Sequence, residues 1–319
     1  MDRRISWIRA PAALALVALL FTCAFWPGAS LTVGTQPAAG ASPPPGSRTL
    51  HYASNTSGDL DGALKLGFNL IDVAGNKNQP ARVKAVIDAL PDGVKALVWV
   101  GNIGKKAGQA PGFSDAQFRV QVNGLAGDPK VFGYFLADEP EPAACPDAIA
   151  RIRARADYVH ARAPGQKTFI TIVDGSNRCG KALGCEYAAL APAHTHVDLF
   201  GLDPYPCHFD ERGRAAPCDT QKIIDHVKSA EANGIPAARI VQVFQTFGQE
   251  GQSAGKERPF YRLPTPAELE AMLATWGTVV PEPAFDWPYT YGARGKSSRL
   301  ATLSSQPALQ AVIQAHNQK

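Results

Sequence analysis

From residue 49 onward, short hydrophobic runs alternate with longer segments in which apolar residues recur every three or four positions. The short runs are rich in Val, Ile, Phe, Tyr and Thr, which is typical of strands, and the longer segments have the periodicity of amphipathic helices. The pattern predicts strands at 50–54, 68–74, 96–101, 131–137, 168–173, 197–203, 240–247 and 284–291. It predicts helices at 81–90, 115–125, 146–162, 219–233, 265–280 and 305–317.

Several of these helices begin at a residue suited to an N-terminal cap, namely Ser114, Asp219, Thr265 and Ser305. Eight strands alternating with about eight helices over about 270 residues is the pattern of a (β/α)8 barrel. An open doubly wound sheet is the main alternative, and the absence of a nucleotide-binding glycine loop disfavours it. We therefore expect a single α/β domain folded as a TIM barrel.

The first part of the chain differs in composition from the rest. Arg3, Arg4 and Arg9 form a basic start, and the apolar run that follows is shorter than the roughly 20 residues of a spanning helix. We expect a signal peptide or N-terminal anchor at 1–30, a disordered Pro/Gly/Ala-rich linker at 31–48 and the catalytic barrel at 49–319. The protein is then secreted, extracellular or anchored to the cell envelope, with no other membrane contact.

The charge balance excludes one class of partner. The net charge is +4, of which Asp2, Arg3, Arg4 and Arg9 together contribute +2. The rest of the chain is close to neutral and has no basic stripe, so nucleic-acid binding is not expected. We expect a monomer.

Five cysteines lie in the expected barrel. Cys179 and Cys185 are close in sequence, as are Cys207 and Cys218, and in an exported protein such pairs oxidise. Cys145 is left over. Metal-ligand spacing is absent, so we expect neither a metal site nor a cofactor.

In a (β/α)8 barrel, side chains at the carboxyl ends of the strands meet at one mouth. The run Gly133–Pro140 ends a hydrophobic strand with Asp138 and Glu139, and Pro140 stops the strand there. Polar and aromatic residues at the ends of other strands are Asp72, Asn102, Asp203, Tyr205, Gln245, Asp286, Trp287 and Tyr289. Aromatic rings stack on sugar rings and carboxylates bind their hydroxyls, so this mouth predicts a carbohydrate substrate.

The adjacent carboxyls suit the cleavage of a glycosidic bond, which needs an acid to protonate the leaving oxygen. Glu139 is our candidate for that acid, because the negative charge of Asp138 raises its pKa. The competing interpretation is that Asp138 and Glu139 only cap the helix that follows.

The chain resembles the (β/α)8 glycoside hydrolases of clan A, in which the acid/base Glu ends strand 4 and often precedes Pro. The matching residues are Asp138-Glu139-Pro140, with Asp in place of the usual Asn, and Asp203-Pro204-Tyr205-Pro206 resembles the end of strand 6. The resemblance covers the repeat from about residue 49 to the end. Together with the predicted export segment, it implies a secreted hydrolase of O-glycosyl bonds in an extracellular or cell-wall polysaccharide or oligosaccharide, with Glu139 as general acid.

One position departs from the clan A pattern, since its nucleophilic Glu ends strand 7 and this chain has Gln245 there. Glu250 lies five residues further on and is one candidate nucleophile. Alternatively, Asp203 or Asp286 acts as the base of an inverting reaction, with the two carboxyls roughly 6.5–9.5 Å apart.

A third mechanism lets the substrate supply its own nucleophile. N-acetylhexosaminidase-like barrels end strand 4 with an adjacent Asp and Glu, and Asp138-Glu139 resembles that pair. The resemblance implies that Asp138 orients the acetamido group of the sugar, that Glu139 protonates the leaving group, and that Tyr205 or Tyr289 holds the acetamido oxygen. The sequence leaves all three mechanisms open.

Two other functions compete with glycoside hydrolysis. Gln245 at the nucleophile position motivates a non-catalytic carbohydrate-binding protein on a decayed glycosidase barrel. A metal-dependent deacetylase or esterase is disfavoured because the sequence has no His/Asp cluster, and His51 at the start of the first strand reads as buried structure.

Overall fold

The computed structural model describes residues 49–319 apart from 57, 104–111, 174–182, 250–259 and 294–299. Within this part, eight parallel strands close into a barrel in sequence order, and the last strand is hydrogen-bonded to the first. The strands are β1 (Leu50–Ala53), β2 (Leu70–Ala74), β3 (Lys95–Trp99), β4 (Val131–Ala137), β5 (Lys167–Ile172), β6 (Leu199–Leu202), β7 (Ile240–Gln245) and β8 (Phe285–Tyr289). The predicted (β/α)8 barrel is confirmed.

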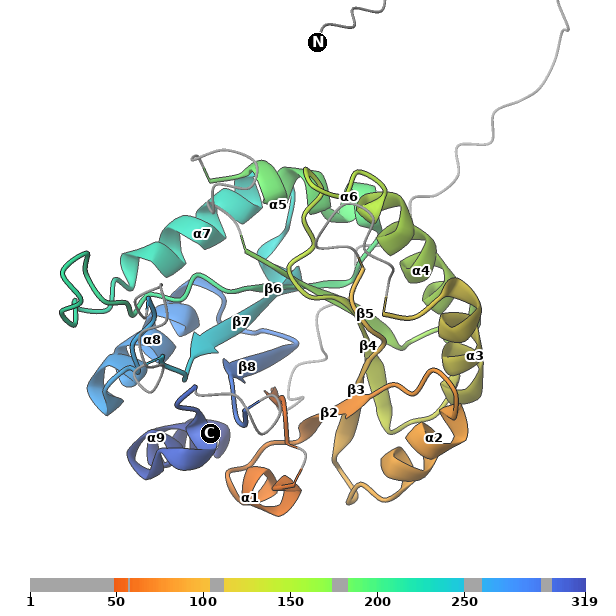
Figure 1. The fold of residues 1–319 in the computed structure, drawn as a ribbon, viewed down its shortest axis with the longest axis horizontal. Helices are drawn as coiled ribbons and strands as arrows, with labels where there is room; N and C mark the ends of the chain where they lie inside the picture. Colours follow the sequence, from red (N-terminus) through yellow and green to blue (C-terminus); the bar gives the residue numbers. More distant parts are fainter. Residues whose placement is uncertain (1–48, 57, 104–111, 174–182, 250–259, 294–299) are drawn as a thin grey trace, which may run out of the picture. The chain divides into compact units, whose positions relative to one another are not determined.

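Helices surround the barrel on the outside (Figure 1). They are α1 (Leu60–Lys65), α2 (Pro80–Asp88), α3 (Asp115–Leu125), α4 (Ala148–Arg162), α5 (Cys185–Leu190), α6 (Pro192–Thr195), α7 (Gln221–Ala232), α8 (Pro266–Val279) and α9 (Pro307–Asn317), with 3-10 turns η1 (Ala237–Arg239) and η2 (Leu303–Ser305). None of the helices in the described ranges is both long and apolar enough to cross a membrane. The predicted signal peptide or anchor at 1–30 and linker at 31–48 lie outside the described residues.

Two of the four predicted caps form full capping boxes. Ser114 accepts a hydrogen bond from the backbone N–H of Gln117, and Thr265 accepts one from that of Glu268. In return, the side chains of Gln117 and Glu268 accept from the backbone N–H of Ser114 and Thr265. The N-caps of α7 and α9 are instead one residue later than predicted, at Thr220 and Gln306.

The core has two layers because alternate residues of each strand face opposite sides. One layer lies between the strands and the helices, and the other fills the barrel. The interior is mainly aromatic: the ring centroids of Phe169 and Phe285 are 5.0 Å apart, and those of Phe135 and Trp287 are 5.8 Å apart. Phe135 and Trp287 also line the pocket at the mouth, so the aromatic interior forms the floor of that pocket.

The strand that carries the acidic pair contains an irregularity. Its register against β5 shifts between Phe135 and Ala137. Phe135 packs in the barrel interior, whereas Leu136 and Ala137 both belong to the outer layer. Simple alternation from Phe135 would turn Ala137 inward and Asp138 outward. The shift reverses this, and Asp138 faces the mouth.

The cysteines agree with the predicted pairing where the structure describes them. Cys207 and Cys218 form a disulfide with an S–S distance of 2.02 Å, which confirms that pair. Cys185 is also disulfide-bonded, and Cys179 lies outside the described residues. Cys145 is a buried free thiol, as the pairing implied.

Candidate active site

The acidic pair directly follows β4, and residues of the two neighbouring strands hold it there. The backbone N–H of Asp138 donates to Asn102 Oδ1 at 3.0 Å. Thr171 of β5 bridges the pair: its hydroxyl accepts from the N–H of Glu139 and donates to Asp138 Oδ1, both at 3.0 Å. Asn102 therefore positions the backbone of the pair and does not line the pocket described below.

Glu139 has an uncommon backbone conformation, with φ of 47°. The left-handed region costs a residue with a Cβ atom on the order of 1 kcal/mol, and such residues cluster at functional sites. This turn separates the directions of the two side chains: Asp138 lines the pocket, while the Glu139 carboxyl meets Asp203, which follows β6.

Asp203 is an acid of the mouth whose pKa is shifted. Its side chain is buried, and its Oδ1 has no hydrogen-bond partner among the described residues. Burial, then the negative charges of Glu139 and Asp138 and a hydrogen bond with Glu139, raise the pKa of Asp203 well above its usual range. These effects favour the protonated form of Asp203 at its contact with Glu139.

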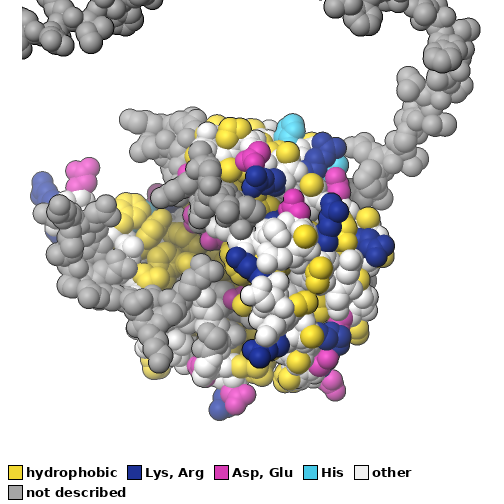
Figure 2. Space-filling view, turned by 45° about the vertical axis from the view of Figure 1, so that its right-hand side comes forward, with side chains coloured by type: hydrophobic (Ala, Val, Ile, Leu, Met, Phe, Trp, Pro, Cys, Tyr) yellow, Lys and Arg dark blue, Asp and Glu magenta, His cyan; other side chains and the backbone are white. Residues whose placement is uncertain are grey.

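Beside this pair lies a pocket at the mouth of the barrel. The pocket is lined by Tyr52, Ser54, Asn55, Asp72, Trp99, Phe135, Asp138, Trp287 and Tyr289. The indole N–H of Trp287 donates to Ser54 Oγ at 2.9 Å, and the hydroxyls of Ser54 and Thr290 are 3.2 Å apart. These bonds fix the plane of the indole. Figure 2 shows a hollow lined by hydrophobic side chains, with acidic side chains at its margin.

Aromatic rings continue from the pocket toward the rim. Tyr289 stacks on Tyr205 with an interplanar angle of 29°. Tyr205 in turn contacts Tyr261, whose ring contacts Phe260 at a centroid distance of 4.8 Å. Phe260 is 53% exposed, while Tyr205 is buried. Burial raises the pKa of Tyr205 well above its usual range, so its phenol stays neutral.

Gln245, which we expected at the substrate site, is not among the residues that line the pocket. Its Oε1 accepts from the backbone N–H of Cys207 at 2.8 Å. Its Nε2 donates to the carbonyls of Cys207 and Arg262, both at 2.9 Å, and of Phe247 at 3.3 Å. The side chain is fully buried among these groups and ties the loop after β6 to the loop after β7. It is a structural amide at the position where clan A has its nucleophile.

Asp286 corrects a second expectation, since it does not rim the mouth. It is the second residue of β8, next to His51 in the register, and lies at the amino-terminal end of the strands. Its neighbours Phe285 and Trp287 face the barrel interior, so Asp286 faces the helices and contacts His51 and His316. Burial raises its pKa, but hydrogen bonds with His316 and His51 outweigh that effect and lower it.

Of the predicted site residues, the structure brings together Asp72, Asp138, Trp287 and Tyr289 in the pocket and Glu139, Asp203 and Tyr205 beside it. Glu250 lies outside the described residues. Sequence reasoning missed Thr171. Thr171 lies two residues after Phe169, whose side chain faces the barrel interior near the end of β5. Strand alternation therefore predicts that Thr171 faces inward too.

No family model and no curated protein matches this chain. Solved structures with a similar fold include a chitinase from Chromobacterium violaceum, with 14% identity, 83% of this chain and 98% of that chain covered, and a TM-score of 0.50. The spore cortex-lytic enzyme of Bacillus cereus matches with 10% identity, 83% and 73% coverage and a TM-score of 0.53. A β-galactosidase from Marinomonas ef1 matches with 9% identity, 85% and 59% coverage and a TM-score of 0.56.

Identities this low establish the fold and nothing finer. In fold, the chain is a (β/α)8 barrel like those of glycoside hydrolases. Membership of clan A stays a prediction.

Proposed function

We propose that this chain is a secreted glycoside hydrolase that cleaves a polysaccharide or oligosaccharide of acetamido sugars with the help of the acetamido group itself. The observation that carries the proposal is the hydrogen-bonded pair of Asp203 and Glu139 beside an aromatic pocket that contains Asp138. The similarity in fold to a chitinase supports the choice of substrate class. The predicted export segment and the Cys207–Cys218 disulfide support secretion.

The roles of the two paired acids follow from their exposure. Glu139 is partly exposed, whereas Asp203 is buried. A general acid must hold a proton before it delivers it, and the raised pKa of Asp203 favours a proton at this pair. We infer that the more exposed Glu139 delivers this proton, which reaches it through the hydrogen bond with Asp203. When the bond between the anomeric carbon and the leaving oxygen breaks, Glu139 protonates that oxygen, and water later restores the proton.

The second catalytic group is assigned from the positions of the other carboxylates. An inverting base needs room for a water between the carboxyls, and Asp203 is already hydrogen-bonded to Glu139. Asp286 is at the other end of the strands. Asp138, in contrast, lines the pocket and is held by Thr171. This position supports the inference that Asp138 orients an acetamido group whose oxygen attacks the anomeric carbon.

Replacement of Glu139 by Gln tests the assignment of the acid. We expect kcat on chitin oligosaccharides to fall by about 10²- to 10⁴-fold, while the fold and the affinity for the sugar persist. Glu141→Gln makes the same change two residues away, outside the pocket lining, and is expected to leave kcat unchanged. Undiminished turnover in Glu139→Gln would remove the proposal.

A second experiment tests the role of the acetamido group. A thiazoline derived from N-acetylglucosamine mimics the cyclic intermediate and is expected to inhibit competitively. Glucose polymers that lack the acetamido group should not be cleaved. Cleavage of chitin oligosaccharides and of glucose polymers at similar rates would rule out substrate assistance. Binding of the sugars with no product from any polymer would favour a carbohydrate-binding protein on a decayed barrel.

A further inference from the structure

A cluster of two imidazoles and one carboxylate lies far from the mouth, at the seam where the barrel closes. His51 belongs to β1 and Asp286 to β8, and they are partners in the register of these two strands. His316 comes from the last turn of α9. The cluster therefore joins the first strand, the last strand and the last helix.

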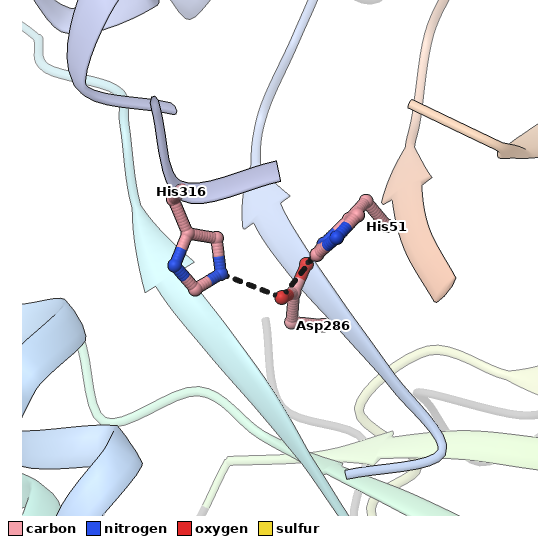
Figure 3. Close-up of side chains that lie close together, drawn as sticks. All are labelled: His51, Asp286 and His316. Carbon is pink, nitrogen blue, oxygen red and sulfur yellow. Dashed lines mark hydrogen bonds and ion pairs between the residues drawn. The ribbon is translucent and has the colours of Figure 1, made fainter. Parts of the chain in front are cut away.

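The side chains converge on one small space (Figure 3). His51 Nδ1 is 3.0 Å from each oxygen of Asp286, and His316 Nε2 is 2.8 Å from Oδ2. One ligand atom from each residue lies within 4.8 Å of the other two. His51 and Asp286 are buried, whereas the His316 side chain is 24% exposed, which provides a path for an ion from solvent.

The buried Asp286 carboxylate requires a partner within the cluster. A buried carboxylate is costly unless it is paired or binds a metal. Among the described residues, the hydrogen bonds to the Asp286 carboxylate come from the two imidazoles. A divalent cation between the three side chains would pair with the carboxylate and take the place of these hydrogen bonds.

The donor set and the distances indicate which ion fits. Two imidazole nitrogens and one carboxylate oxygen, with one position left for water, match a four-coordinate zinc ion. Bonds of roughly 2.0–2.2 Å in a tetrahedron place the ligand atoms about 3.3 Å apart. The present contacts of 2.8 and 3.0 Å need to lengthen by only a few tenths of an ångström. Any proton on the ligating nitrogens would move to the other ring nitrogen or to solvent.

We propose that His51, Asp286 and His316 bind one zinc ion that fastens the C-terminal helix to the closing seam of the barrel. The ion is structural, because the cluster lies at the opposite end of the strands from the acidic pair. This site is independent of the hydrolase proposal.

Zinc titration of the chelator-treated full chain, followed by calorimetry and thermal unfolding, tests the site. We expect one zinc per chain and a rise in Tm on adding zinc, and Co²⁺ in its place should give the visible absorption of a four-coordinate site. His316→Gln should weaken zinc binding at least tenfold and abolish the rise in Tm. His160→Gln is the matched control, since His160 also pairs with one carboxylate, that of Asp198, and among the described residues this pair is not part of a three-ligand cluster.

Absence of zinc uptake would overturn the proposal, and the three side chains would then be joined by hydrogen bonds alone. Zinc binding that His316→Gln leaves unchanged would also overturn it, by placing the ion elsewhere. If His316→Gln does not fold, zinc K-edge absorption of the unaltered protein decides instead. Two imidazoles in the ligand shell support the site, and a shell without them refutes it.

Discussion

Replacement of Gln245 by Glu distinguishes a structural amide from a lost nucleophile. If Gln245 were the remnant of a catalytic Glu, restoring the carboxylate would leave the fold intact and add hydrolytic activity. The structure predicts the opposite, because the Nε2 atom donates to three backbone carbonyls, at 2.9, 2.9 and 3.3 Å. A carboxylate has no hydrogen to offer these oxygens.

The cost follows from the donors that are lost. As an ion, the introduced carboxylate would place a buried negative charge against three carbonyls, so the acid would be protonated instead and keep one donor. At least one buried carbonyl then loses its partner, at about 1–3 kcal/mol, and the neutralisation adds to this. We expect Gln245→Glu to lower the free energy of unfolding by about 3 kcal/mol, or Tm by about 6–12 °C.

Urea denaturation and thermal unfolding measure this cost, and an assay on the sugar panel measures any gain of activity. Gln242→Glu is the matched control on the same strand: its Nε2 donates to one carbonyl, that of Val280, so a smaller loss is expected. A Tm for Gln245→Glu within about 2 °C of the unaltered protein, or new hydrolysis, would refute the structural interpretation.

Three further predictions concern stability and binding. Asp203→Asn should stabilise the protein by about 1 kcal/mol at pH 8 while lowering kcat. The folded-state pKa of Asp203 is raised above its unfolded value, so this acid contributes stability at low pH that is lost as pH rises through the folded pKa, and the amide removes this loss. Urea midpoints with the same pH dependence in both proteins would contradict the reasoning. Phe260→Ala should raise KM for long oligosaccharides about fivefold, with short substrates unaffected, because the exposed ring extends the aromatic series from the pocket; equal effects on both lengths would argue against an outer sugar site. Replacing Cys207 and Cys218 by Ala should cost about 3 kcal/mol, since the disulfide closes a loop with a sequence separation of 11; unfolding of the oxidised and reduced native protein provides the comparison.

The sequence predicted an element correctly where its conformation depends mainly on neighbouring residues. The hydrophobic run at 131–137 is β4 to the residue, and the amphipathic segment at 115–125 is α3. The boxes at Ser114 and Thr265 need only residues three positions apart. Asp219 and Ser305 are also suited to the N-cap position, but in the structure the N-cap is the next residue in each case. Sequence does not show which of two neighbours leaves the helical conformation first.

The contacts that define the sites join strands that are far apart in the chain. The pairing of Glu139 with Asp203 depends on the turn at Glu139 and on where β6 ends, and no periodicity records either. Asp286 illustrates the same limit, because its contact with His51 spans 235 positions and exists only once β8 closes on β1.

The amino-acid sequence by itself determined the barrel and the acids at the end of its fourth strand, because strand and helix periodicities are properties of neighbouring residues. Tertiary structure alone decided which side chains face the mouth. A register shift in β4 turned Asp138 inward, and the backbone groups around Gln245 made that amide part of the scaffold. Both outcomes depend on hydrogen bonds between segments that approach each other only after the strands have closed into a ring.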